Sequence, residues 1–311
     1  MVVTDELAIS RLEHVPTWFG IGGGADRFAT VRNVEQLRRA IEIDPRLRIL
    51  GDGANLLVDD DGVGELVVRI DGDLAAWTID VAKGTVSVGA GANLPKLINE
   101  TVRQGLAGLE TLGGIPASVG GALTMNAGGK FGEIEQFVVR VHAIDREGRE
   151  IALERKDVQF GYRRSGLNEL ILTSCDLQLA PDDAGAVRRR LKEVMSYKKT
   201  SQPMAEKSAG CTYKNPTLEH DIMDLYDANG RAGRRVPAGL LIDRAGLKGL
   251  SVNAVSVSDV HANFFVTRPG AKASDVIALM EDVERRVLDR YGVRLEREIV
   301  VWSRHAQGHH R

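Results

Sequence analysis

The sequence is poor in cysteine and has no excess of either charge. Its 311 residues include two cysteines, Cys175 and Cys211, which lie far apart and form no Cys-x-x-Cys motif. This usage fits a reducing compartment better than a disulfide framework. Lysine and arginine number 41, against 43 aspartates and glutamates, so no overall field attracts nucleic acid or an anionic membrane. An anionic ligand must therefore be held by local groups.

Signals for export, membrane insertion and metal binding are also missing. The first residues, MVVTDELAISRLEH, contain no basic segment followed by an apolar run, so we expect no signal peptide, no membrane insertion and a cytoplasmic location. The seven histidines form no His-Glu-x-x-His pattern, so we expect no metal site. Three of them lie in the polar segment 304–311, which we expect to be disordered. The remaining composition is that of a globular chain of two or three domains.

Glycine, in contrast, is concentrated in three segments, 17–26, 50–58 and 105–132. Glycine loses more conformational entropy on folding than other residues, so such segments need a reason, such as main-chain amides that closely approach a ligand. One glycine-rich loop alone would be explained more simply as an ordinary turn. Three of them favour one shared ligand, and a cofactor with phosphates is the natural candidate.

The first glycine segment does not predict a Rossmann site. Residues 20–25 match Gly-x-Gly-x-x-Ala, but the strand-like segment 27–31 follows them. A dinucleotide-binding turn of that type comes after a strand and opens a helix. The order of turn, strand, helix and strand at the start of this chain therefore excludes it.

Periodicity and capping residues predict an α+β chain. Asn33, with Gln36 as its capping-box partner, begins a helix that reaches Ile43. The other expected helices cover 93–104, 183–199, 238–245 and 274–291, the last with Ser274 as its N-cap and Gly292 as its stop. The expected strands cover 27–31, 47–50, 65–70, 85–90, 137–144, 149–153, 170–179, 263–267 and 295–302.

Four further segments combine reactive side chains with turn-forming residues. They are FGYRRS at 160–165, SAGCTYKNP at 208–216, DVHANF at 259–264 and LEREIV at 295–300. Together with the glycine segments, and in this order, they resemble the UDP-N-acetylenolpyruvoylglucosamine reductases of peptidoglycan synthesis, also called UDP-N-acetylmuramate dehydrogenases or MurB. The resemblance extends over nearly the whole chain. The short segment between 165 and 183 is similar to the type II form of that family.

The resemblance implies a fold and a domain organisation. The fold class would be α+β, with an FAD-binding domain of the vanillyl-alcohol-oxidase type in two subdomains and a C-terminal α+β substrate-binding domain. A polar run, TSQPMAEKSAG, begins at residue 200. We therefore expect the FAD-binding domain at 1–200, split near 75–80, and the substrate-binding domain at 201–303.

The resemblance gives the second and third glycine segments separate roles in holding FAD. The turn after strand 47–50 would hold the pyrophosphate with its backbone amides, and the later segment would follow FAD toward the isoalloxazine ring. Asp52 lies in that turn, and because a carboxylate repels a diphosphate, we expect its side chain to point away. The expected cofactor-binding residues are Gly51, Gly53, Ala54, Asn55, Gly114, Ile115, Pro116, Ser118, Gly120, Gly121, Asn126 and Ala127.

The resemblance also implies the reaction. NADPH would reduce FAD, and flavin N5 would then pass a hydride to C3 of the enolpyruvyl ether, so that negative charge builds up on the substrate carboxylate. Arg163, which matches the arginine of the family's YRxS motif, would stabilise that charge. Cys211 stands where most relatives carry the serine that protonates C2. A thiol, with a free pKa of about 8.5, is a stronger acid than an alcohol and can do the same.

Glu298 matches the family's catalytic glutamate, which would share a proton with the substrate carboxylate. Close to that anion, its pKa should be raised. On an alternating strand, Glu296 points to the same face, so spacing alone does not choose between the two. The resemblance selects Glu298, with Glu296 as the alternative.

The remaining motif residues would contact the UDP-sugar substrate, whose diphosphate needs cationic and amide donors. The expected substrate-binding residues are Tyr162, Lys214, Asn215, Lys248, His261 and Asn263. We predict no protein partner.

Two other functions compete with this interpretation. A different FAD-dependent oxidase or dehydrogenase could share the cofactor-binding fold, since a fold alone does not fix the reaction. A sugar-nucleotide-binding protein without catalytic activity would bind the ligand and not convert it.

Overall fold

The computed structural model describes residues 6–304, so the predicted tail lies outside the described residues except for Arg304. The chain divides into two compact units, each assembled from separate segments of the sequence. Unit 1 consists of the residues up to Leu12, 25–52 and 64–198, and unit 2 of 13–24, 53–63 and 199 onward.

The smaller sheet of unit 1 begins the fold and has four strands. Helix α1 (Val34–Ile43) packs on it through Leu37 and Ala40. Asn33 Oδ1 accepts from Gln36 N at 2.8 Å, and the Gln36 side chain accepts from Arg32 N, one residue before the predicted partner. The strands, in sheet order, are β1 (Ile9–Leu12), β2 (Ala25–Val31), β5 (Val63–Ile70) and β3 (Arg48–Leu50).

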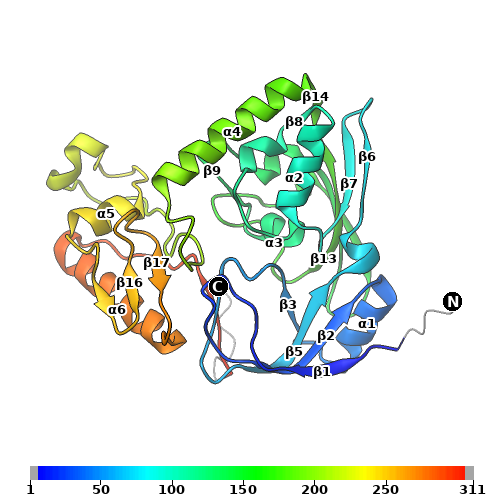
Figure 1. Ribbon diagram of the computed structural model, residues 1–311, viewed down its shortest axis with the longest axis horizontal. Coiled ribbons are helices and arrows are strands. Elements are labelled where there is room, and N and C mark those ends of the chain that lie inside the picture. The colour runs from blue at the N-terminus through cyan, green and yellow to red at the C-terminus, as the bar shows by residue number, and fades with distance from the viewer. Residues whose placement is uncertain (1–5, 305–311) are drawn as a thin grey trace. The chain divides into compact units, whose positions relative to one another are not determined.

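The larger sheet of unit 1 is antiparallel and has five strands. Helices α2 (Leu94–Arg103) and α3 (Val119–Thr124) cover one of its faces (Figure 1). Cys175 lies in the resulting core with its side chain fully buried, and burial strongly raises the pKa of its thiol. The strand order is β12 (Glu150–Glu154), β11 (Val138–Ile144), β13 (Ile171–Gln178), β7 (Thr85–Gly89) and β6 (Trp77–Asp80).

Short elements and one long helix complete unit 1. Helix α4 (Ala184–Ser201) packs through Leu191 against Gly113, where a side chain would collide with it. The short strands pair as β8 (Leu106–Ala107) with β14 (Ala180–Pro181), and β9 (Gly128–Gly129) with β10 (Gly132–Glu133). The 3₁₀ helices are η1 (Gly72–Ala75), η2 (Leu109–Leu112), η3 (Ile134–Phe137) and η4 (Arg155–Asp157).

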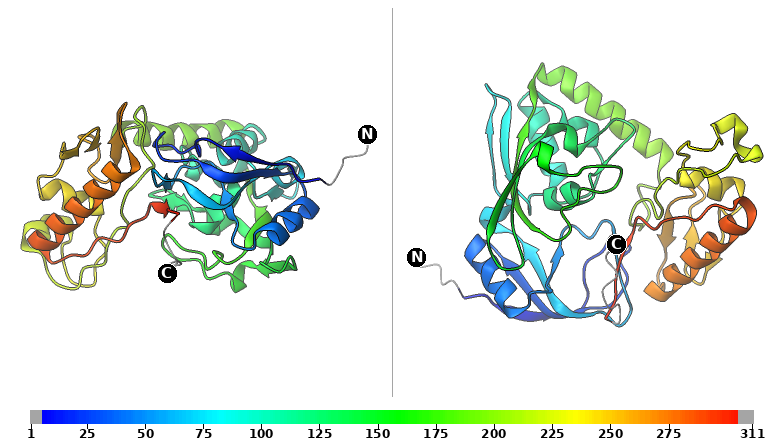
Figure 2. Two further views of the ribbon diagram at one scale, coloured as in Figure 1. Left: turned by 90° about the horizontal axis from the view of Figure 1, so that it is seen from below. Right: turned by 180° about the vertical axis from the view of Figure 1, so that it is seen from behind.

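Unit 2 is built around a three-stranded antiparallel sheet. Figure 2 shows helix α6 (Ala273–Tyr291), in orange, beside this sheet. The sheet consists of β15 (Ser251–Val252), β16 (Val255–Val257) and β17 (Phe265–Thr267), and the other elements are α5 (Ala238–Arg244), η5 (Met223–Ala228) and the parallel pair β4 (Leu56–Val58) and β18 (Val300–Trp302).

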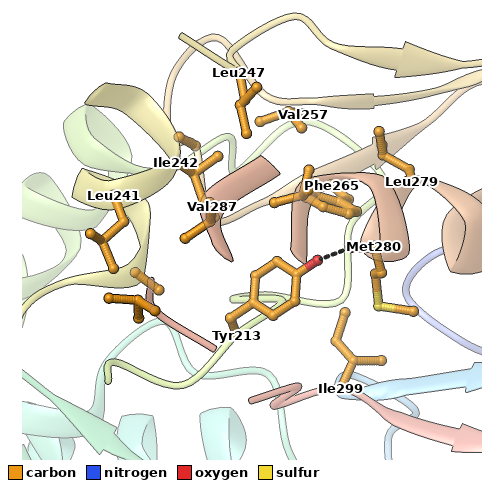
Figure 3. Packing of buried hydrophobic residues seen from close by; sticks show 14 of the residues in the cluster. Tyr213, Leu241, Ile242, Leu247, Val257, Phe265, Leu279, Met280, Val287 and Ile299 are labelled. Carbon is orange, nitrogen blue, oxygen red and sulfur yellow. Dashed lines mark hydrogen bonds between the residues drawn. The ribbon is translucent and has the colours of Figure 1, made fainter. Parts of the chain in front are cut away.

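Tyr213 occupies the core of unit 2 (Figure 3). Its side chain is fully buried, its ring meets Phe265 edge-on with centroids 6.0 Å apart, and its hydroxyl donates to Met280 O at 2.8 Å. A buried tyrosine hydroxyl needs such a partner. This residue therefore anchors the 208–216 segment to α6.

Two predicted boundaries in unit 2 are wrong. Ser274 is not the N-cap of α6, which begins at Ala273. The carboxylate of Asp60, far away in sequence, accepts from the backbone N–H groups of Ala273 and Ser274 at 2.8 and 3.0 Å, and from Ser274 Oγ at 2.7 Å. A distant side chain thus satisfies the start of the helix, and no local pattern indicates it.

The predicted strand 295–302 is regular only at β18. Before it, Glu296 O accepts from Lys214 N, and Glu298 N donates to Thr212 O, both at 2.8 Å. These contacts belong to an irregular pairing with segment 212–214 rather than to a sheet ladder. The other predicted helices and strands are present, with ends within about two residues of those expected.

Candidate functional site

Arg163 lies in a tight turn of unit 1 with a strained backbone. Gly161 and Arg164 exchange both backbone hydrogen bonds, at 3.0 and 3.2 Å, so Tyr162 and Arg163 are the central residues of the turn. Arg163 has a φ of +55°, whereas the other three non-glycine residues with positive φ in the described part of the chain are asparagines. This conformation costs a residue with a Cβ about 1–2 kcal/mol. Such strain persists where surrounding contacts impose it, often at functional sites.

Three hydrogen bonds tie this turn to the end of the third glycine segment. Asn126 Nδ2 donates to Gly161 O at 3.1 Å, and Arg163 Nη2 donates to Gly128 O at 3.0 Å. Ser165 Oγ donates to Thr124 O at 2.8 Å. The structure therefore places predicted catalytic, substrate-binding and cofactor-binding residues in one cluster within unit 1. Tyr162 belongs to it too, since its ring centroid lies 5.2 Å from the Arg163 guanidinium carbon.

Asn126 uses its side chain within the protein. It is completely buried, and its amide also donates to Glu133 Oε2 at 3.0 Å and accepts from Glu135 N at 3.3 Å. The sequence predicts this residue to bind the cofactor. The contacts of its side chain position neighbouring loops, and binding of the cofactor at this residue stays a prediction.

Packing within the protein also explains several of the glycines that are predicted to bind the cofactor. A Cβ on Gly120 would lie 3.0 Å from the Cβ of Ala90, and one on Gly114 would lie 3.0 Å from the Lys198 side chain. A Cβ on Gly51 would lie 2.7 Å from the hydroxyl of Ser118, the N-cap of α3. The structure thus brings Gly51 and Ser118 together, as two residues predicted to touch the same ligand should be.

The turn that follows β3 has a donor set that fits a diphosphate. In the described part of the chain, the backbone N–H groups of Gly53, Ala54 and Asn55 donate to no protein acceptor. Gly53 has a φ of +64°, and a Cβ there would lie 2.2 Å from Pro16 O, so only glycine allows this close approach. Successive backbone N–H groups form anion-binding concavities. These residues therefore fit the phosphate groups of FAD.

The side chain of Asp52 is directed to the start of α2. Asn93, the N-cap of that helix, donates from Nδ2 to Asp52 Oδ2 at 2.9 Å, while Asn93 Oδ1 accepts from Lys96 N at 3.1 Å. A carboxylate is favourable near a helix N-terminus. No motif in the sequence indicates that Asn93 is the partner of Asp52.

In unit 2, the main chain of Thr212 brings Cys211 and Glu298 onto neighbouring segments. Thr212 O accepts from Glu298 N at 2.8 Å, and Asn55 Nδ2 donates to Glu298 O at 2.8 Å. Cys211 is paired with Phe264 by a β-bridge and is half-buried, as is Glu298. Two of the three predicted catalytic residues therefore lie on neighbouring segments of unit 2, whereas Arg163 belongs to unit 1.

Asn263 also holds the backbone of Thr212 and Tyr213. Its Oδ1 accepts from Tyr213 N at 2.9 Å, its Nδ2 donates to Tyr213 O at 2.8 Å, and its own backbone O accepts from Thr212 N at 2.7 Å. The residue is 2% exposed. Predicted to bind substrate, Asn263 serves here to hold the backbone that follows Cys211.

The contacts of the two glutamates differ. Glu296 is 71% exposed and forms an ion pair with Lys214 Nζ at 2.6 Å. Glu298 is half-buried and adjoins Thr212. The two side chains therefore differ in exposure and in partners, and the catalytic choice of Glu298 over Glu296 stays a prediction.

The other predicted substrate residues all lie in unit 2. Asn215 Oδ1 accepts from Ala238 N at 2.9 Å and so caps α5, and Lys248 pairs with Asp243 at 2.9 Å. His261 accepts at Nδ1 from Asn263 N at 3.2 Å, and burial lowers the pKa of its imidazole below the ordinary value.

Thr212 is a further residue of the candidate site that the sequence did not single out. It is completely buried, and its Oγ1 has no hydrogen-bond partner among residues 6–304. The signal available in the sequence is its position between the predicted residues Cys211 and Lys214. Its contacts, however, are with segments some 50 and 85 residues away, at Asn263 and Glu298.

Known protein families match both the N-terminal and the C-terminal part of the chain. Residues 202–302 match the model of the UDP-N-acetylenolpyruvoylglucosamine reductase C-terminal domain, and residues 25–154 match an FAD binding domain. The UDP-N-acetylenolpyruvoylglucosamine reductase of Desulfosudis oleivorans is 37% identical, with 92% of this chain and 91% of that protein covered. The chain belongs to the UDP-N-acetylenolpyruvoylglucosamine reductase family.

Two other members of the family are also similar to this chain over most of its length. A relative from Symbiobacterium thermophilum, named UDP-N-acetylenolpyruvoylglucosamine reductase 2, is 35% identical over 97% of this chain and 94% of its own length. The crystal structure of the family member from Thermus caldophilus superposes with a TM-score of 0.79 at 40% identity, covering 96% of this chain and all of that chain. The predicted α+β fold class, an FAD-binding domain followed by a C-terminal α+β domain, is confirmed.

The part of the chain that the structure describes has neither a membrane-spanning helix nor a cluster of metal-ligating side chains. None of the helices there combines the length and the apolar character needed to cross a membrane. Within the same residues, no group of three or more His, Cys, Asp and Glu side chains is arranged to hold a metal ion.

The strain at Arg163 predicts that glycine is the more stable replacement. Arg163→Gly and Arg163→Ala both lose the guanidinium, but only glycine adopts positive φ without cost, so the glycine variant should be more stable by about 1 kcal/mol. Urea unfolding measures the difference. At Arg164, whose φ is not positive, the order should reverse, with alanine the more stable. Equal stabilities of the two Arg163 variants would show that the turn carries no strain.

Proposed function

We propose that this chain catalyses the NADPH-dependent, FAD-mediated reduction of UDP-N-acetylenolpyruvoylglucosamine to UDP-N-acetylmuramate, in the synthesis of peptidoglycan precursors. The observation that carries the proposal is similarity over more than nine-tenths of the chain to relatives that bear this name, at 35–37% identity. The hydrogen bond from Glu298 N to Thr212 O, which places the segments of Cys211 and Glu298 next to each other, supports it.

The proposed reaction gives the cofactor and the site residues three tasks. FAD, when bound, would supply the hydride that is added to C3 of the enolpyruvyl group. Arg163 is a permanent cation and would stabilise the charge that develops on the substrate carboxylate. The Cys211 thiol would donate a proton to C2, and Glu298 would share a proton with the substrate carboxylate. Lys214, Lys248 and His261 would contact the UDP-sugar.

The remaining predictions complete the proposal. Residues 1–200 would form the FAD-binding domain, split near 75–80, and 201–303 the substrate-binding domain, in a type II member of the family. Gly53, Ala54 and Asn55 would hold the FAD diphosphate through their backbone amides. The enzyme would act in the cytoplasm with a UDP-sugar and NADPH as its ligands.

The purified protein tests the function directly. It should show a flavin absorbance spectrum and oxidise NADPH rapidly only when UDP-N-acetylenolpyruvoylglucosamine is present. A flavin that is instead reduced by an alcohol or a sugar, without NADPH, would indicate another flavoenzyme of the same fold. Binding of the UDP-sugar without NADPH oxidation would indicate a protein that recognises the ligand and does not convert it.

The role of Cys211 predicts two different outcomes at one position. Cys211→Ser keeps a hydroxyl as proton donor and should retain substantial turnover, whereas Cys211→Ala should lose about 10²- to 10⁴-fold in kcat. Both variants should keep bound flavin, since the diphosphate donors lie elsewhere. Steady-state NADPH oxidation measures the difference, and near-normal turnover of Cys211→Ala would exclude the thiol as the proton donor.

The two glutamates provide a matched pair. Glu298→Gln keeps the size of the side chain but loses its proton, and kcat should fall by about 10²-fold or more. Glu296→Gln removes an exposed ion pair, and kcat should change by less than about fivefold. The same assay compares both variants. A larger loss in Glu296→Gln would transfer the catalytic role to Glu296.

A further inference from the structure

The contacts of Asn126 assign it a task in the reaction that is separate from binding FAD. We propose that Asn126 is a positioning residue: its side-chain amide holds the 161–164 turn, and with it Arg163, in the conformation that catalysis requires. The inference rests on the proposed role of Arg163. It concerns residues of unit 1 alone.

The hydrogen bond from Asn126 acts on the turn itself. Gly161 O accepts from Asn126 Nδ2 at 3.1 Å and from Arg164 N at 3.2 Å. Two donors therefore fix this carbonyl, which is part of the peptide group that leads into Tyr162 and Arg163. A strained φ at Arg163 persists only if its surroundings impose it, and the Gly161 carbonyl is the group through which Asn126 does so.

The site requires asparagine for three reasons. Two acceptors, Gly161 O and Glu133 Oε2, face its Nδ2, and one donor, Glu135 N, faces its Oδ1. A carboxylate has no donor, and a hydroxyl has only one. The backbone φ is +43°, a conformation that asparagine tolerates better than most residues. The residue is also fully buried, so water does not replace a lost partner.

Asn126→Asp replaces the donor with a carboxyl group beside Glu133 and turns the contact into a pH-dependent one. A buried pair of carboxyl groups shares a proton, which raises the apparent pKa of the pair. At pH 8 the turn should lose its donor, and kcat should fall about 10- to 100-fold, as expected for a misplaced catalytic group. At pH 5.5 a protonated pair regains one donor, so part of the loss should be recovered. Asn126→Ala should lose activity without recovery.

The two half-reactions separate positioning from general damage. Arg163 is proposed to act on the enolpyruvyl substrate and not on NADPH. In rapid-mixing experiments, Asn126→Ala should therefore keep flavin reduction by NADPH within about twofold and slow flavin reoxidation by the substrate about 10- to 100-fold. Equal changes in both steps, or none, would overturn the proposal. If the proposed function fails, the unaltered chain itself will show no reoxidation by this substrate.

A second readout does not depend on activity. Trypsin cleaves after arginine when the backbone can unfold locally, so Asn126→Ala should be cut faster after Arg163 and Arg164, as followed by mass spectrometry. Ser165→Ala removes another bond to the turn, Ser165 Oγ to Thr124 O, and should show the same change if Asn126→Ala does not fold. Unchanged cleavage in both variants would refute the idea that these bonds hold the turn.

Asn253 offers a matched control in unit 2. It also has a positive φ, +49°, and its Nδ2 donates to a carboxylate, Asp275 Oδ1, at 2.7 Å. Asn253→Asp therefore also places two carboxyl groups side by side, at an exposed position away from the 161–164 turn. It should leave both half-reactions and the cleavage after Arg163 unchanged at both pH values. A pH-dependent loss equal to that of Asn126→Asp would show that the effect is one of general stability.

Discussion

The candidate site depends on hydrogen bonds from asparagine side chains to irregular backbone. Buried peptide groups outside helices and sheets still need partners, and the segments that carry the site are mainly turns and isolated bridges. Asn263 satisfies both main-chain groups of Tyr213, and Asn55 holds the carbonyl of Glu298. Because an amide presents a donor and an acceptor at one end, it joins two loops without a continuous ladder. Site residues from distant parts of the sequence are fixed in this way.

Most of the regular structure could be predicted from the sequence because its signals are local. Asn33 and Asn93 are the N-caps of α1 and α2, and each side chain accepts from the backbone N–H three residues later. Gly292 ends α6 in the left-handed conformation. At the start of α6, Asp275 accepts locally from Lys272 N, but the second capping carboxylate, that of Asp60, is distant in sequence and could not be predicted. Short strands such as β1 and β15 were missed for a similar reason. Two to four residues carry little periodicity, and only distant partners define them.

The motifs predicted which segments form the candidate site better than they predicted the contacts of each residue in it. Cys211 and Glu298 are on neighbouring segments, as the resemblance implies, yet the amides of Asn126 and Asn263 bind backbone. The glycines illustrate the same difficulty. A Cβ on Gly22 would lie 2.2 Å from Val58 O and one on Gly53 2.2 Å from Pro16 O, so packing within the protein explains both glycines. Gly53 differs in that the backbone N–H groups of residues 53–55 donate to no acceptor in the described part of the chain. Sequence shows that close approach is needed but not whether the neighbour is the chain itself or a ligand.

The contrast between the two thiols has a chemical consequence. Cys175 is sealed in the core of unit 1, and its raised pKa keeps it protonated and inert. Cys211 is half-buried on a segment that neighbours that of Glu298, in a position where the resemblance places serine in most relatives. A mild electrophile should therefore label this chain at one position, next to the proposed chemistry. A cysteine in this position, which we propose as the proton donor, also gives the protein a selective site for covalent modification that a serine would not provide.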